Sequence, residues 1–237
     1  MKSGTHFHFK QFSVRHDRCA MKVGTDAVLL GAWVDVSNAA TILDIGTGSG
    51  VIALMLTQRT SHSTIVEAVE IEKNSAEQAI ENVNNSPWSS RIQIHQVAIQ
   101  DYLPAGRFDL IVTNPPYFNN SLLPPDKDRH LVRHTSSLSY DDLLSSVSRL
   151  LTPDGRFNLI LPYQEALLFT ESARQDQLSC TRRYHFKTRK EKPVERTLLE
   201  FRMNARPVDE GEILLYDQAL EWSTSYRNLI SEFYIKG

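Results

Sequence analysis

Cysteine is scarce in this chain of 237 residues, and the two that occur, Cys19 and Cys180, lie far apart. Neither has a partner at the spacing of a zinc site or a disulfide framework, so the sequence predicts no metal and no disulfide. Apolar runs long enough to span a bilayer are missing, and the first ten residues lack the hydrophobic stretch of a secretory signal. These absences favour a cytoplasmic protein without a membrane partner.

An excess of charge of one sign is missing as well. The 26 lysine and arginine residues stand against 28 aspartate and glutamate residues, which gives a net charge of −2. Nucleic acid could therefore be bound only through a local basic cluster. Apolar residues make up 41% of the chain, as in packed globular proteins, and the length fits one domain over residues 1–237, which we expect to be a monomer.

Strand-like and helix-like segments alternate along most of the chain. Buried-strand patterns cover 41–45, 64–70, 92–97, 108–113 and 156–161, and helical patterns cover 51–59, 73–85, 140–150 and 163–176. This alternation predicts an α/β fold with a mostly parallel sheet and helices on both faces. The runs 180–188 and 196–203 are joined too closely for a crossover helix, so we expect a C-terminal antiparallel hairpin.

The segments outside this alternation carry weaker signals. Residues 6–14 alternate as one strand, and residues 22–33 predict a turn at Gly24 and a short helix capped by Thr25 or Asp26. The tetrapeptide TPDG (152–155) is a turn signal, and the tail 212–235 reads as a strand followed by a helix.

A glycine-rich turn joins the first core strand to the first core helix. The stretch LDIGTGSG places Gly46, Gly48 and Gly50 at the carboxyl end of the strand, where glycine lets the backbone approach a ligand closely. A tight turn that only packs helix against strand is the alternative interpretation.

Acidic residues around this turn favour a cationic ligand. Asp44, just before the glycines, would repel a pyrophosphate, whereas S-adenosylmethionine carries an ammonium and a sulfonium and no phosphate. The next strand ends at Glu70, followed by Ile71 and Glu72, and a carboxylate there is placed to accept hydrogen bonds from ribose hydroxyls. We favour Glu70 over Glu72 because it ends the apolar run. S-adenosylmethionine is therefore the expected cofactor.

The segment LIVTNPPY (110–117) ends a strand with an amide, two prolines and a phenol. Methyl transfer to a planar amine requires its delocalised lone pair to localise on nitrogen, and two acceptors facing the N–H bonds would stabilise the developing charge. The Asn114 side chain and the Pro115 carbonyl can be those acceptors, and Pro116 stiffens the turn. Tyr117 offers a face on which a planar base can stack. An ordinary strand-ending turn is the alternative.

The motifs LDIGTGSG, AVEIE and NPPY, in that order, resemble those of class I S-adenosylmethionine-dependent methyltransferases that modify planar amino groups. Together with FKQFSVRHDRCAMKVGTDAVLLGAW, ENVNNSPW and FDLIVTNPPY, the chain resembles the bacterial tRNA(Val) adenine-N6 methyltransferases, from about Phe9 to the tail. The resemblance implies a Rossmann-like fold with a seven-stranded sheet, a cofactor-covering extension (1–35), a core (36–203) and a C-terminal extension (204–237).

The same resemblance implies further site residues. Lys22, Gly24, Thr25 and Asp26 would lie along the cofactor, and Ile71 beside it. Many relatives contact the cofactor's adenine through an acid at the end of the third strand, where this chain has Ala98. Either Asp101 substitutes for that acid, or backbone groups near Ile99 do so.

Two basic segments are candidates for contact with tRNA, the expected partner. The first is RRYHFKTRKEK (182–192), and the second lies in the loop after Tyr117; their candidate residues are Arg182, Arg183, Lys187, Arg189, Lys190, Lys127, Arg129 and Arg133. A solvated hairpin without ligand is the alternative for the first segment.

Four other functions remain open. A protein-glutamine N5 methyltransferase uses the same NPPY chemistry but usually has a helical domain before the glycine turn, for which Asp44 leaves little room. A DNA adenine methyltransferase would be expected to carry a target-recognition insert. A small-molecule methyltransferase and an RNA-binding module with a silent methyltransferase fold are the remaining two.

Overall fold

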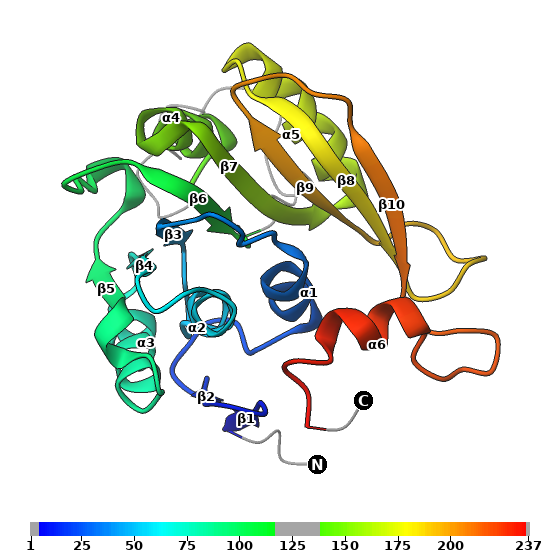
Figure 1. Cartoon of the computed structure of the whole chain (residues 1–237), viewed down its shortest axis with the longest axis horizontal. Coiled ribbons are helices and arrows are strands. Elements are labelled where there is room, and N and C mark those ends of the chain that lie inside the picture. Colours follow the sequence, from blue (N-terminus) through cyan, green and yellow to red (C-terminus); the bar gives the residue numbers. More distant parts are fainter. Residues whose placement is uncertain (1–4, 117–137, 236–237) are drawn as a thin grey trace, which may run out of the picture.

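The computed structural model of the chain describes residues 5–116 and 138–235 (Figure 1). Its centre is an eight-stranded sheet in the order β10-β8-β9-β7-β6-β3-β4-β5. The strands are β3 (Thr41–Ile45), β4 (Ile65–Glu70), β5 (Ile92–Gln96), β6 (Phe108–Thr113), β7 (Leu151–Pro162), β8 (Ser179–Lys187), β9 (Arg196–Arg202) and β10 (Asp209–Leu214). β9 runs antiparallel to β7 and β8, whereas the other neighbours in the sheet are parallel.

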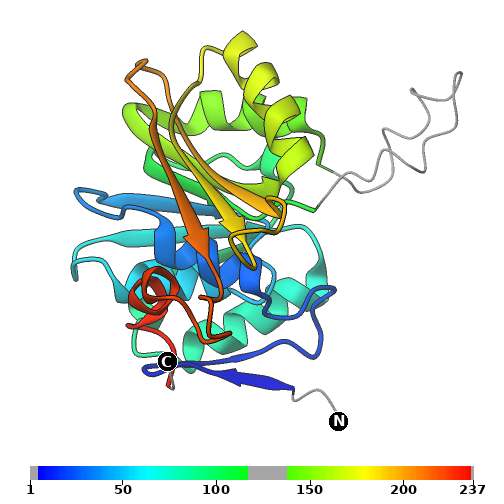
Figure 2. The ribbon, with the colours of Figure 1, turned by 90° about the vertical axis from the view of Figure 1, so that its right-hand side faces the viewer.

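Helices cover the sheet on both faces (Figures 1 and 2). They are α1 (Thr25–Trp33), α2 (Val51–Gln58), α3 (Lys73–Asn84), α4 (Tyr140–Leu150), α5 (Tyr163–Gln175) and α6 (Thr224–Ile230), with short 3-10 turns at η1 (Ser89–Arg91) and η2 (Ile99–Asp101). α1, α2, α3 and α6 contribute to one apolar cluster, and α4 and α5 to the other. These helices and strands confirm the predicted α/β architecture.

Side chains of the central strands alternate between the two clusters, as the pleat of a strand requires. Ile42 packs in the cluster with α1 and α2, whereas Leu43 and Ile45 pack in the cluster with α4 and α5. By this alternation Asp44 lies on the same face as Ile42, where α2 covers it. Burial of both faces explains why the strands β3 and β6 have nearly continuous apolar sequences.

The N-terminal segment differs from the expected single strand. It forms a hairpin of β1 (His6–His8) and β2 (Ser13–Arg15), because the Phe9 amide donates to the Phe12 carbonyl at 2.9 Å and reverses the chain. The rings of Phe9 and Phe12 stack with centroids 4.5 Å apart, and both are buried. The alternating pattern over 6–14 therefore did not reveal the turn, which begins at Phe9 and ends at Phe12.

Two other local predictions need correction. Gly24, in an extended conformation, precedes α1 as its N-cap and no side chain caps the helix, so neither Thr25 nor Asp26 has that role. The TPDG tetrapeptide, which was predicted to be a turn, lies within β7. The register of β6 with β7 shifts between Phe108–Leu151 and Leu110–Arg156, so residues 152–155 bulge opposite Asp109.

The sheet has one strand more than the expected seven. β10 pairs with β8 in parallel, with Gly211 beside Tyr184. Its sequence DEGEIL shows little of the apolar pattern of a strand, and ion pairs to β8 accompany the pairing instead: Asp209 with Arg182 at 3.4 Å, Glu210 with Arg183 at 2.9 Å and Glu212 with Lys187 at 2.5 Å. Opposite charges on neighbouring strands stabilise such a pair.

Replacing Gly211 by alanine should destabilise the protein by about 1–3 kcal/mol, the range for an overpacked contact. An added Cβ would lie 2.4 Å from Tyr184 Cε1, and the Tyr184 ring is held against Trp33 with centroids 5.6 Å apart. Urea unfolding of both proteins measures the difference. Gly106→Ala is the matched control, because an added Cβ there meets nothing within 4 Å; equal stability of Gly211→Ala and wild type would contradict the packing argument.

Candidate functional site

The glycine turn between β3 and α2 holds all three of its glycines in left-handed conformations. Gly46, Gly48 and Gly50 have φ angles of +68°, +56° and +81°, which side chains other than that of glycine rarely tolerate. An added Cβ at Gly46 or Gly48 would meet nothing within 4 Å. Backbone conformation, and not crowding, therefore requires glycine here, and the space in front of the turn is open.

Asp44 lies behind this turn and is fully buried. Its Oδ2 accepts hydrogen bonds from the Thr47 hydroxyl and from the Ala53 amide at 3.2 Å, so the carboxylate holds the turn to the first residues of α2. Its Oδ1 is buried without a hydrogen-bond partner among the described residues. Burial raises the pKa of Asp44 to about 7, against the opposing effect of the bonds from Thr47 and Ala53, and the nearby Glu70 charge adds to the increase.

Glu70 reaches the glycine turn from the end of β4. One of its carboxylate oxygens accepts the Gly48 amide at 2.9 Å and the other accepts the Glu72 amide at 2.9 Å. Glu72 instead caps α3 by accepting the amides of Asn74 and Ser75. Ile71, between the two acids, is exposed. The structure thus brings Glu70, and not Glu72, into contact with the glycine turn.

The residues after β5, the third core strand in the sequence, were expected to contact the cofactor's adenine. Ala98 precedes η2, and Asp101 at its end is exposed. The side chain of Ile99 is buried, and its carbonyl already accepts a bond from Arg149 Nη2 at 3.0 Å. These positions do not decide between Asp101 and the backbone near Ile99 as the group that contacts an adenine, so both alternatives stay predictions.

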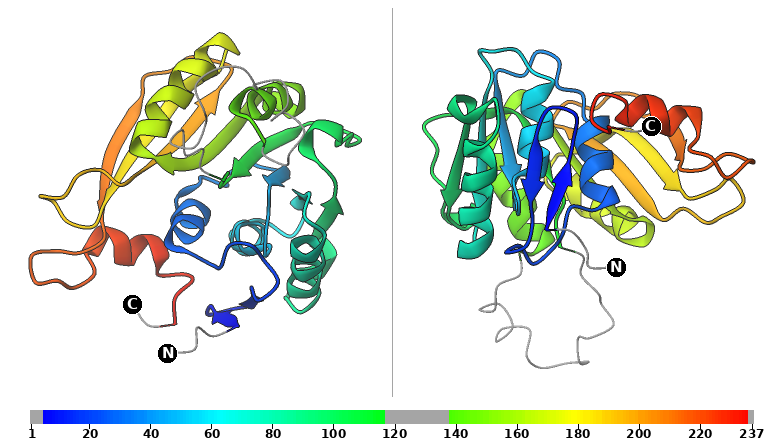
Figure 3. Two further views of the ribbon diagram at one scale, coloured as in Figure 1. Left: turned by 180° about the vertical axis from the view of Figure 1, so that it is seen from behind. Right: turned by 90° about the horizontal axis from the view of Figure 1, so that it is seen from below.

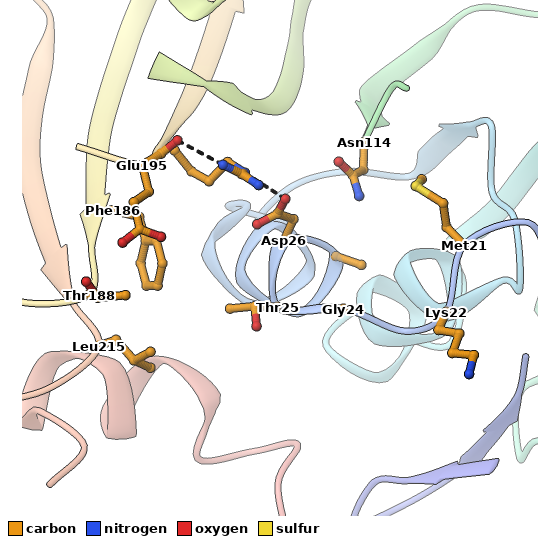
Figure 4. Close-up of a pocket in the computed structure, with 12 residues that line it drawn as sticks. Met21, Lys22, Gly24, Thr25, Asp26, Asn114, Phe186, Thr188, Glu195 and Leu215 are labelled. Atoms are coloured by element: carbon orange, nitrogen blue, oxygen red, sulfur yellow. Dashed lines mark hydrogen bonds and ion pairs between the residues drawn. The ribbon is translucent and has the colours of Figure 1, made fainter. Parts of the chain in front are cut away.

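Asn114 follows β6 and lines a cavity of about 400 Å³ (Figure 4). Its Oδ1 is buried and has no hydrogen-bond partner among the described residues. Pro115 is buried and Pro116 is exposed, so the turn after Asn114 is packed on one side only. Tyr117 and the basic residues Lys127, Arg129 and Arg133 lie outside the described residues.

The cavity collects residues that are far apart in the sequence. One wall is the segment before α1 and its first turn, which supplies Met21, Lys22, Gly24, Thr25, Asp26 and Ala27. The other wall comes from the β8–β9 turn and the end of β10, with Phe186, Thr188, Glu195, Arg196 and Leu215. Across the cavity Arg196 Nε donates to Asp26 Oδ2 at 2.8 Å, as Figure 4 shows beside Asn114.

The sequence singled out four residues of the first wall, Lys22, Gly24, Thr25 and Asp26, and no residue of the second as a site residue. Phe186 is almost completely buried, and it also lines the cavity. Arg196 was not singled out, because nothing in the local sequence links it to Asp26, 170 residues earlier. The sequence feature that could have identified Arg196 is its position directly after the basic turn.

The predicted basic cluster is largely neutralised. Arg182, Arg183 and Lys187 form the ion pairs with β10 described above, and Arg182 also packs over the Trp33 ring at 4.3 Å. Arg189 and Lys190, in the turn after β8, form no ion pair with another described residue. Within the predicted basic cluster, the described side chains without an ion-pair partner therefore lie at the β8–β9 turn, next to the cavity.

Residues 5–116 and 138–235, which the structure describes, contain neither a metal-binding cluster nor a helix that could cross a membrane. No group of three or more His, Cys, Asp or Glu side chains in these ranges is arranged to hold a metal ion. None of the helices described there combines the length and apolarity that a bilayer crossing requires.

Comparison with known proteins identifies relatives over nearly the whole chain. The family model of the methyltransferase small domain matches residues 19–160. The tRNA1(Val) (adenine(37)-N6)-methyltransferases of Trichodesmium erythraeum and Bacteroides fragilis (strain ATCC 25285) are each 44% identical, covering 98% and 97% of this chain and 99% and 98% of their own. The protein of the same name from Dyadobacter fermentans is 38% identical and covers 100% of both chains.

Solved structures of low sequence identity share the fold. A predicted O-methyltransferase of Agrobacterium tumefaciens matches with a TM-score of 0.69 at 17% identity, covering 88% of this chain and 96% of its own. The glycopeptide N-methyltransferase MtfA, in complex with S-adenosylmethionine, matches with a TM-score of 0.57 at 12% identity, covering 77% and 100%.

Asp44→Asn should stabilise the protein, by an amount that grows with pH. Because the folded-state pKa lies near 7 and the unfolded value near 3.8, ionisation of Asp44 costs stability progressively between about pH 4 and pH 7. The unfolding free energy of the variant minus that of wild type should therefore rise by a few kcal/mol over this interval and level off above it. Urea titrations at several pH values measure this difference.

The exposed carboxylate of Asp101 supplies the control for this series. Asp101→Asn removes a carboxylate at an exposed position and so controls for the loss of a negative charge as such. A difference for Asp44→Asn that stayed constant from pH 4 to pH 8 would mean that Asp44 is not held in its protonated form.

Proposed function

This chain belongs to the family of the tRNA1(Val) (adenine(37)-N6)-methyltransferases, within the methyltransferase small domain family, and on that premise we propose its reaction. It transfers a methyl group from S-adenosylmethionine to the exocyclic amine of an adenosine beside the anticodon of a tRNA. The observation that carries the proposal is the Asn114 Oδ1, a buried acceptor without a described donor at the wall of the cavity.

A buried acceptor without a partner is costly, so its persistence indicates a ligand that brings a donor. The exocyclic amine of adenine is a poor nucleophile because its lone pair is delocalised into the ring. As nitrogen becomes tetrahedral, its N–H bonds become more acidic and bind acceptors more strongly. Asn114 Oδ1 and the Pro115 carbonyl, fixed before the reaction, would stabilise that charge more than they stabilise the ground state.

The glycine turn fits the cofactor. The open space before Gly46 and Gly48 admits a ligand close to the backbone, and the Glu70 carboxylate, which already accepts the Gly48 amide, lies at this turn. Glu70 would accept from ribose hydroxyls, with Lys22, Gly24 and Thr25 on the covering side. When bound, S-adenosylmethionine supplies a methyl group made electrophilic by its sulfonium.

The cavity suits a single nucleoside. Its volume of about 400 Å³ lies within the range of small-ligand sites, and Phe186, Leu215 and Met21 provide apolar surface against which a planar base can pack. An anticodon-loop adenosine is already partly unpaired, so its extrusion costs less than flipping a base from a duplex. No general base is assigned, because the methylated amine is acidic enough to release its proton to water.

The β8–β9 turn is the proposed tRNA contact. Thr188, Glu195 and Arg196 line the cavity, so the basic side chains of Arg189 and Lys190 on the same turn stand at its margin. Phosphate contacts there would provide affinity and orientation without reading the sequence. Arg182, Arg183 and Lys187 would contribute less, because β10 already supplies their counter-charges.

The direct test is incubation with S-adenosylmethionine carrying a labelled methyl group and total tRNA from a bacterial strain that lacks the corresponding enzyme. Nucleoside mapping should find the label as N6-methyladenosine next to the anticodon. Label in protein glutamine or in duplex DNA would favour the corresponding alternative function, and absence of transfer from bound cofactor would favour a silent RNA-binding module.

Asn114→Ala should lower turnover on that tRNA by roughly 10²–10³-fold, the effect of losing one preorganised hydrogen-bonding group. Binding of S-adenosylmethionine should change little, because the loss affects the transition state and not the cofactor. Single-turnover kinetics and calorimetry measure the two quantities. Asn84→Ala, at an exposed asparagine of α3, is the control; turnover of Asn114→Ala close to wild type would contradict the assigned role.

Replacing both Arg189 and Lys190 by glutamine should weaken tRNA binding and flatten its salt dependence. Each lost phosphate contact removes about 0.7–0.9 from the slope of log K against log salt concentration. Filter binding at several salt concentrations measures the slope. The pair Arg182→Gln and Arg183→Gln serves as comparison and should change the slope less; the reverse order of effects would relocate the contact to the β10 side.

A further inference from the structure

Two buried amide side chains on α3 connect the N-terminal segment to the glycine turn. Gln78 and Asn82 lie four residues apart, which places them on one face of the helix. Gln78 is 0% exposed and Asn82 is 3% exposed. Figure 3 shows the N-terminal chain passing from its hairpin along α3 before it enters α1. Buried amides need several partners each, and these two find them outside their own helix.

Asn82 bonds to both sides of the candidate site. Its Oδ1 accepts the Arg15 amide at 2.9 Å, and its Nδ2 donates to the Arg15 carbonyl at 2.8 Å. The same Nδ2 donates to the carbonyl of Ser49, in the glycine turn, at 2.8 Å. One side chain therefore fixes the backbone of the N-terminal segment and the backbone of the glycine turn relative to each other.

Gln78 extends this attachment by one helical turn. Its Oε1 accepts the Arg18 amide at 2.7 Å, and its Nε2 donates to Asp17 Oδ1 at 3.2 Å. Exposed ion pairs reinforce the contact, among them Arg18 with Glu81 at 2.5 Å. The chain continues within four residues to Met21 and Lys22, which line the cavity with Asn114. Placement of residues 15–18 thus sets where the cavity wall begins.

We propose that Asn82 and Gln78 are positioning residues that join the cofactor side of the site to its substrate side. In this proposal, the N-terminal segment covers the glycine turn only when it is attached to α3. Because Asn82 bonds both Arg15 and Ser49, this attachment depends on the conformation of Ser49 and its neighbouring glycines. The inference rests on the proposed function, because it takes S-adenosylmethionine as the ligand of the glycine turn. It also gives a physical role to ENVNNSPW, the motif that contains Asn82.

Asn82→Asp is the sharpest test. It keeps an acceptor for the Arg15 amide but removes the N–H groups that bond the Arg15 and Ser49 carbonyls. Affinity for S-adenosylmethionine, measured by calorimetry well below the melting temperature, should fall roughly ten- to a hundredfold. Asn84→Asp is the matched control: it adds the same charge to the last turn of α3 at an exposed position, so effects on the helix dipole cancel.

Limited trypsin digestion separates positioning from a general loss of stability. In the wild type, S-adenosylmethionine should slow cleavage after Arg15, Arg18 and Lys22. In Asn82→Asp this protection should largely disappear, even at temperatures where circular dichroism shows a folded protein. Gln78→Glu, which places a carboxylate against Asp17, should speed cleavage after Arg18 with a smaller effect on cofactor affinity, because Gln78 has no bond to the glycine turn.

The outcomes distinguish the inference from the function on which it rests. Failure of the wild type to bind S-adenosylmethionine would overturn the proposed function. Wild-type binding with unchanged affinity and unchanged protection in Asn82→Asp would overturn the positioning role alone. If Asn82→Asp does not fold, the Gln78→Glu digestion still decides: protection of residues 15–22 equal to wild type would refute the attachment.

Discussion

The parallel pairing of β3 with β6 is the constraint on which the site depends. It places Asp44 opposite Val112 and Ile45 opposite Thr113, so the two strands end together. The Thr113 hydroxyl then donates to the Ile45 carbonyl at 2.8 Å, a bond that ties the two strand ends just before the chain leaves the sheet. The glycine turn begins directly after Ile45, and Asn114 directly follows Thr113. Any shift of register would separate the glycine turn from Asn114.

The same pairing brings together two acceptors without described donors. Asp44 Oδ1 on β3 and Asn114 Oδ1 directly after the adjacent β6 are both buried, and neither has a hydrogen-bond partner in the parts of the chain that the structure describes. A folded protein tolerates such groups where a ligand completes them. Both atoms lie at the carboxyl ends of neighbouring strands, Asp44 Oδ1 behind the glycine turn and Asn114 Oδ1 at the wall of the cavity.

Sequence reasoning predicted the core of the fold because the core follows simple patterns. The buried strands from Thr41 to Thr113 and the helices between them have the apolar runs and periodicities of an alternating α/β protein. The glycine turn and the segment after β6 were visible because their residue types are required by backbone conformation and by chemistry. Glu70 could be chosen over Glu72 by the same logic, since it ends an apolar strand.

Features held by long-range polar contacts could not be predicted in this way. β10 was expected only as a strand beginning at residue 212; its first residues, 209–211, have the composition of a charged loop and join the strand where β8 presents matching charges. The far wall of the cavity depends on Arg196 meeting Asp26, a contact set by tertiary structure alone. Residues 152–155 have the composition of a turn but are carried inside a strand as a bulge, because pairing resumes at Arg156. Composition alone does not determine the conformation of such segments, because it is set by contacts with neighbouring strands.

The acids of β10 also influence how a large polyanion can approach. Asp209 and Glu210 are more than half exposed at the outer edge of the sheet, where they cancel the arginines of β8. A phosphate backbone drawn toward that edge would gain little attraction, and unpaired edge amides there are flanked by carboxylates that discourage pairing with another strand. Among the described residues, the charge around the β8–β9 hairpin is thus asymmetric: its turn carries basic side chains without ion-pair partners, and its flank along β10 is neutral. A polyanion approaching this hairpin would be attracted to the turn and not to the outer strand.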